Sequence, residues 1–138
     1  MAKDHLSMRI PSEILQSLER EARRTGRPLT TLAVELLEDG LIMRLYPGIY
    51  IREGASGRRP ALMGHRIDVQ HVVETVAAEQ GDLGRAADLF GLPVGLIRSA
   101  MEYYADHRHA VDRSIAADHE FAIEAERRWR ATPGSATA

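Results

Sequence analysis

The sequence predicts a mainly α-helical protein with a few short β-strands. Residues 5–10 alternate apolar and polar side chains, the pattern of a strand with one buried face. Longer stretches place apolar residues three or four positions apart, which is typical of amphipathic helices. Between these stretches, residues 47–69 are rich in Gly, Pro and β-branched residues and indicate a β-hairpin.

Composition limits the possible functions. The chain has 138 residues, 44% of them hydrophobic, which suffices for one domain or two small ones. Its net charge is −2, so it is not a uniformly basic nucleic-acid coat, and the absence of cysteine excludes disulfides and thiolate metal sites. No apolar run approaches the roughly 20 residues of a membrane span, and the N-terminus lacks the apolar core of a signal peptide. We therefore expect a soluble cytoplasmic protein.

The first 44 residues predict the order strand, helix, helix. Pro11 ends the alternating segment and, with Ser12 and Glu13, marks a helix start. Gly26 should end this first helix as a left-handed cap. The second helix should follow Pro28 and end near Gly40.

A single short strand cannot satisfy its own backbone groups, and its apolar face would stay exposed. Both problems disappear if two copies pair their strands antiparallel. Leu6, Met8 and Ile10 would then cover a shared core. The alternate side chains would point outward from the two-stranded ribbon; these are His5, Ser7 and Arg9.

Residues 5–41 resemble a ribbon-helix-helix DNA-binding domain. The matching features are the alternating strand, Pro11, an amphipathic helix and the stretch TGRPLTTLAVELLEDGL. The resemblance implies an intertwined dimer whose outward strand residues, here His5, Ser7 and Arg9, read bases in the major groove. The alternative is a solvated strand edge.

The same resemblance implies that the start of the second helix holds a DNA phosphate, because free amide groups and the helix dipole favour an anion there. This role maps onto Thr30 and Thr31, which could also be ordinary helix-start residues. Pro28 departs from the polar cap often found at this junction and removes one donor. Lys3 and Arg27 are flanking phosphate contacts or plain surface residues.

Residues 45–110 predict a hairpin followed by three helices. The first strand contains Ile49 and Ile51, a long turn covers residues 53–57, and the second strand covers residues 62–69. Helices should follow from residue 69 to about 80, from 83 to 90, and onward from Pro93. The last two have the outline of a helix-turn-helix.

The step GHRIDV and the helices after it resemble a small domain-of-unknown-function family (DUF433-like) that is common in antitoxins encoded beside PIN-like toxins. The resemblance implies dimerisation or assembly with a toxin. The hairpin is the most basic part of the chain, which leaves two roles open, contact with the DNA backbone or a structural role in the fold. Its basic residues are Arg58, Arg59, His65 and Arg66.

Residues 111–138 predict an amphipathic helix with a frayed end after Pro133. Exposed aromatic and arginine side chains on a helix suit a protein groove, because such residues dominate interface energies. The candidate partner-binding residues are Phe121, Ile123, Arg127, Arg128, Trp129 and Arg130. Their arginines could block the acidic site of a PIN-like ribonuclease. Alternatively, Phe121 and Trp129 pack on the third helix of their own subunit.

Together these features predict three parts, residues 1–44, 45–110 and 111–138. The function expected is a VapB-type antitoxin that binds operator DNA as a homodimer or higher oligomer, represses its operon and neutralises a PIN-like toxin. The alternatives are a stand-alone ribbon-helix-helix regulator and a dimeric assembly adaptor that does not bind DNA. No nucleophile motif or phosphate loop points to an enzyme, and we expect no cofactor and no metal, since the spacing of His107, His109 and His119 suits neither.

Overall fold

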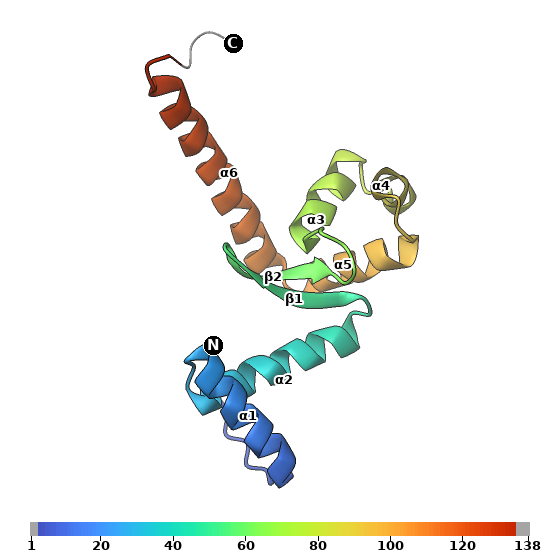
Figure 1. The fold of residues 1–138 in the computed structure, drawn as a ribbon. Coiled ribbons are helices and arrows are strands. Elements are labelled where there is room, and N and C mark those ends of the chain that lie inside the picture. The colour runs from blue at the N-terminus through green and yellow to red at the C-terminus, as the bar shows by residue number, and fades with distance from the viewer. Residues whose placement is uncertain (1–2, 135–138) are drawn as a thin grey trace. The chain divides into compact units, whose positions relative to one another are not determined.

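The structure, a computed structural model, describes residues 3–134 and is mainly helical with one antiparallel hairpin (Figure 1). This agrees with the prediction of a mainly α-helical protein with short β-strands. The elements in chain order are α1 (Ser12–Thr25), α2 (Leu29–Leu45), β1 (Ile49–Gly54), β2 (Gly57–Leu62), α3 (Val69–Ala78), α4 (Leu83–Phe90), α5 (Val94–Asp106) and α6 (Arg108–Ala131). The chain divides into two compact units, the first ending at Leu41 and the second beginning at Ile42.

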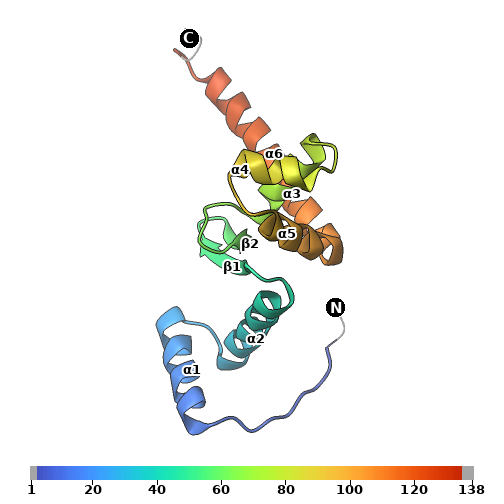
Figure 2. The same ribbon diagram turned by 90° about the vertical axis from the view of Figure 1, so that its right-hand side faces the viewer.

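The predicted strand over residues 5–10 is absent from the single chain. Figure 2 shows this segment as an open stretch leading into α1, and it has no regular secondary structure. A strand needs a neighbouring strand for its backbone hydrogen bonds. The hairpin is the sheet of the described chain, and the segment does not pair with it. The prediction of a strand therefore fails for one isolated copy.

α1 begins and ends where its sequence signals predict. Pro11 precedes it, and Gly26 follows it with φ of 66°, in the left-handed region, where its N–H donates to the carbonyl oxygen of Ala22. α2, in contrast, continues past Gly40 to Leu45, so the predicted end near Gly40 was wrong. A glycine inside a helix costs about 1 kcal/mol, and burial of Ile42 two residues later offsets it.

The hairpin is tighter than predicted. β1 and β2 pair from Ile49 with Leu62 to Gly54 with Gly57, so the turn consists of residues 55 and 56. The expectation of a second strand over residues 62–69 was wrong, because the chain turns at Gly64, where φ is 82°. Pro60 is accepted in β2 because each strand of a two-stranded sheet is an edge strand.

The core of the second unit lies between the hairpin and the helices. α3, α4 and α5 contact one another, and β2 contacts α3 while β1 contacts α5 (Figure 1). The largest fully buried side chains are Ile49, Leu62, Ile97, Val69 and Val72. The three helices predicted after the hairpin are all present, and Asp82 caps α4 by accepting the N–H of Arg85 at 3.0 Å.

An aromatic cluster joins the chain after α2 to the end of α5. The rings of Tyr103 and His107 stack with centroids 4.1 Å apart, and Tyr46 meets Tyr103 edge-on at 5.2 Å. The hydroxyl of Tyr46 donates to Asp106 at 2.6 Å. This hydrogen bond, with burial, raises the pKa of Tyr46 to about 12. Tyr46 is therefore a neutral donor that holds this end of the second unit together.

Candidate functional site

The first unit contains an apolar groove that a single chain leaves open. Its cavity is about 670 Å³, and apolar side chains come from the N-terminal segment and from both helices. We call it the N-terminal groove; its apolar residues are Leu6, Met8, Ile10, Ile14, Leu18, Ala33, Val34, Leu36 and Leu37. Leu6 is 71% exposed and Val34 62% exposed. Contiguous apolar surface of this kind usually marks an interaction site.

The predicted base-reading residues lie on the same segment, and all three are exposed. The ring Nε2 of His5 lies 2.7 Å from the hydroxyl of Ser7, so these two side chains lie on the same side of the segment, as residues two apart in a strand do. His5 also borders the N-terminal groove. Without a second strand, the single chain therefore does not separate an apolar face from a polar one.

The predicted phosphate contacts lie around the start of α2. Thr30 and Thr31 are exposed in its first turn, where helix geometry leaves backbone amides without intrahelical acceptors. Arg27 forms an ion pair with Glu35 of α2, so a phosphate would compete with that carboxylate. Lys3 is exposed.

A network of hydrogen bonds joins the first half of α6 to the rest of the second unit. Asp118 accepts two hydrogen bonds from Arg59 of β2, at 2.7 and 2.8 Å, and one from Gln70 of α3 at 2.7 Å. Ser114 donates to Gln70 at 2.6 Å. The Arg59 hydrogen bond lowers the pKa of Asp118 to about 2, so this carboxylate is charged at neutral pH. The spacing of these residues along the chain does not predict this network.

The second half of α6 projects away from the rest of the second unit (Figures 1 and 2). Phe121 is 77% exposed, Trp129 is 55% exposed and Ile123 is also exposed. The alternative in which Phe121 and Trp129 pack on the third helix of their own subunit, which is α5, is thus not the arrangement of the single chain. These candidate partner-binding residues remain available.

The arginines of this half of α6 form ion pairs within the helix. Arg127 and Arg128 both reach Glu124, and Arg130 reaches Glu126. Pairs of this kind on an exposed helix contribute about 0.2–0.5 kcal/mol each. Breaking these ion pairs to form new ones with the carboxylates of a partner would therefore cost little free energy.

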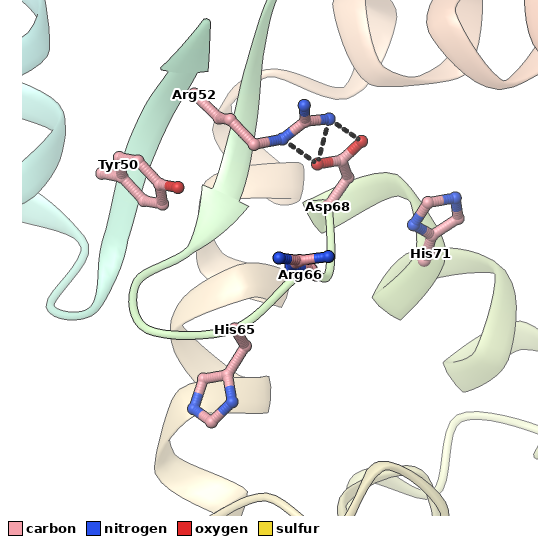
Figure 3. A pocket seen from close by; sticks show the side chains of 6 residues that line it. All are labelled: Tyr50, Arg52, His65, Arg66, Asp68 and His71. Carbon is pink, nitrogen blue, oxygen red and sulfur yellow. Dashed lines mark hydrogen bonds and ion pairs between the residues drawn. The ribbon is translucent and has the colours of Figure 1, made fainter. Parts of the chain in front are cut away.

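The basic residues of the hairpin have separate surroundings. Arg58 pairs with Glu53 across the hairpin, and Arg59 belongs to the Asp118 network, so both are structural. His65 and Arg66 instead line a cavity of about 520 Å³ with four other residues (Figure 3). The others are Tyr50, Arg52, Asp68 and His71. Sequence reasoning missed these four, because they come from separate segments that share no short motif.

Between residues 3 and 134, no three His, Asp or Glu side chains are placed to hold a metal ion. His107 is stacked on Tyr103, and His119 faces Glu74 at 3.1 Å. Over the same residues, no helix combines the length and apolar character that a membrane crossing requires.

Comparison with protein-family models, curated proteins and solved structures finds no match to this chain.

Replacing Asp118 with Asn should destabilise the protein at neutral pH but not in acid. The carboxyl is 38% exposed, so we expect a loss of at most about 1 kcal/mol in the free energy of unfolding at pH 7. A carboxyl whose pKa is lowered by folding stabilises the folded state above its unfolded pKa, near 3.8, and loses this effect as the pH falls toward about 2. Urea denaturation of both proteins across this pH range measures the difference.

Glu120→Gln is the matched control, since it removes an exposed carboxylate two positions away on α6. It should show no comparable difference from the wild type at any pH. A deficit of Asp118→Asn that stayed constant down to pH 2 would contradict the assigned role of this carboxylate.

Proposed function

We propose that this protein is the antitoxin of a type II toxin–antitoxin pair. Two copies pair residues 5–10 into a ribbon-helix-helix dimer that binds operator DNA and represses its own operon. The second unit binds and neutralises a PIN-like ribonuclease toxin. The observation that carries the proposal is the N-terminal groove, an apolar surface built on a segment that has no strand partner in one chain.

A second copy is the occupant that fits this groove best. Residues 5–10 need a strand partner, and the same segment of another copy offers the same alternation of apolar side chains in an antiparallel arrangement. Fully burying one Leu, Ile, Met or Val side chain contributes about 1.5–3 kcal/mol. Several such side chains from each copy would give the dimer ample stabilisation over the open single chain.

Pairing also creates a DNA-reading face. Once the apolar side chains turn inward, His5, Ser7 and Arg9 of both strands point outward from one ribbon, and a two-stranded ribbon fits the major groove. Arg9 can donate two hydrogen bonds to a guanine edge. Thr30 and Thr31 at the start of α2 would hold phosphates on either side, with Lys3 and Arg27 flanking them.

The exposed half of α6 supports the toxin-binding part. It offers two aromatic anchors, Phe121 and Trp129, with Ile123 beside them. The arginines near its end are Arg127, Arg128 and Arg130, and their weak intrahelical pairs suit transfer to the acidic metal site of a PIN-like nuclease. Antitoxins of this kind act in the cytoplasm, and we propose that location here.

Two other functions remain as alternatives to be tested. A stand-alone ribbon-helix-helix transcriptional regulator would bind the operator without a toxin. An assembly adaptor would use the ribbon to dimerise and would not bind DNA. Co-expression with the product of the adjacent gene, followed by pull-down, separates the antitoxin from both, because only the antitoxin should retain a small acidic-site nuclease.

Met8→Asp should convert the dimer into a monomer, because it places a charge in the shared core of the paired strands. Ser7→Asp is the matched control: the same side chain, one position away, points outward and should leave the dimer intact. Sedimentation equilibrium measures both. A wild-type protein that is a folded monomer with mobile residues 5–10 would contradict the proposal.

Arg9→Ala should weaken binding to DNA from upstream of the protein's own gene by about 1–3 kcal/mol and relax base preference at one position in each half-site. Arg23→Ala, on the exposed face of α1, should change affinity much less. Fluorescence anisotropy over a salt series measures both variants. Equal affinity of Arg9→Ala and wild type would favour the adaptor.

Replacing Phe121 and Trp129 together with Ala should abolish or strongly weaken toxin capture, since buried aromatic anchors often contribute 2 kcal/mol or more to an interface. Operator binding should persist. Point substitutions are better than deleting residues 111–138, because that deletion also removes buried Val111 and the Asp118 anchor. Leu89→Ala, 65% exposed on α4, controls for loss of exposed apolar surface, and an equal effect there would refute the assignment.

A further inference from the structure

The cavity beside the hairpin collects hydrogen-bond donors from three segments of the second unit. Tyr50 and Arg52 come from β1, His65 and Arg66 from the turn after β2, and His71 from the first turn of α3 (Figure 3). Figure 3 shows the Arg66 side chain between Tyr50, His65 and His71. Each of the six side chains that line the cavity carries at least one polar atom, and Tyr50 adds an aromatic ring.

The one carboxylate in this cavity is already neutralised. Both oxygens of Asp68 accept hydrogen bonds from Arg52, at 2.9 to 3.1 Å, and Arg59 approaches the same carboxylate at 3.9 Å (Figure 3). The Asp68 side chain is nearly buried, so this pairing is a fixed part of the fold.

Arg66 is left with its charge facing the cavity. Among residues 3–134, no carboxylate pairs with it, in contrast to Arg52, Arg58 and Arg59 of the same region. Two imidazoles and a phenol line the same cavity, each able to donate a hydrogen bond. The cavity therefore presents one guanidinium that no carboxylate pairs with, together with several further hydrogen-bond donors.

We propose that this cavity binds a phosphate group. A guanidinium donates two parallel hydrogen bonds to phosphate oxygens, and the remaining oxygens can accept from the imidazole and phenol donors. A metal cation does not fit, since the only carboxylate is occupied by Arg52 and a cation would face Arg66. The volume of about 520 Å³ also leaves space for part of the molecule that carries the phosphate.

The phosphate has two possible sources, the backbone of a nucleic acid or a small phosphorylated molecule. The inference does not depend on the paired strands of the first unit, because every residue that lines the cavity belongs to the second unit. If the protein binds an operator as proposed, a backbone phosphate would give each subunit a second contact with DNA.

The test is a titration of the full-length protein with inorganic phosphate at constant ionic strength, followed by NMR. We expect saturable shifts of the His65 and His71 ring signals and of the Arg66 side chain. Arg66→Ala should weaken this binding about tenfold or more, the effect expected for losing charge-assisted hydrogen bonds. Arg98→Ala, which removes one exposed guanidinium on α5, should leave it unchanged.

A second arm repeats the titration with a short DNA duplex of unrelated sequence, using Arg9→Ala to weaken the first unit. Shifts at His65 and His71 with the duplex identify a nucleic-acid phosphate, and shifts with inorganic phosphate alone identify a small ligand. The absence of saturable shifts with both probes, or equal binding by Arg66→Ala, would overturn the inference. Failure of operator binding with intact phosphate binding would instead refute only the proposed function.

Discussion

The first unit cannot cover its own apolar surface, and the proposed function depends on this constraint. About forty residues supply two helices and one open segment, which is too little chain to enclose the side chains of the N-terminal groove. Water contact at Leu6, Met8 and Val34 is unfavourable in one copy. A symmetric partner resolves this with no further chain, because strand pairing and apolar burial occur in the same step.

The second unit, in contrast, buries its apolar side chains within one chain. Its hairpin and helices enclose fully buried side chains such as Ile49 and Ile97. The Arg59–Asp118 pair then holds the first half of α6 on this core and leaves the second half projecting. A fixed base with an exposed, aromatic end suits a segment that docks into another protein, because less ordering entropy is lost on binding.

Features that depend on one residue or its immediate neighbours could be predicted from the sequence, whereas features that depend on distant segments could not. Gly26 could be recognised as a helix cap because the left-handed conformation depends on that residue alone. Residues 5–10 alternate as a strand does but form none in the single chain, because a strand needs a neighbouring strand for its hydrogen bonds. The second hairpin strand was misplaced because the polar Arg58-Arg59-Pro60 stretch looks like a loop, while its pairing with β1 is a tertiary effect. The cavity beside the hairpin could not be predicted from the sequence, because Tyr50, Arg52 and His71 are brought together only by the fold.

Net charge is a poor guide to which arginines of this protein are available to an anion, because ion pairs within the fold determine it. Arg52 and Arg59 form ion pairs with Asp68 and Asp118 within the fold, so their charges are compensated there. Arg128 is paired with Glu124, but this exposed ion pair is weak, so a stronger acceptor can replace the glutamate. Arg66 keeps its charge in a concave site lined by donors. A chain with a net negative charge can therefore still contain specific anion-binding positions. Its carboxylates pair with the arginines that stabilise the fold, and the remaining arginines keep their charge available for recognition.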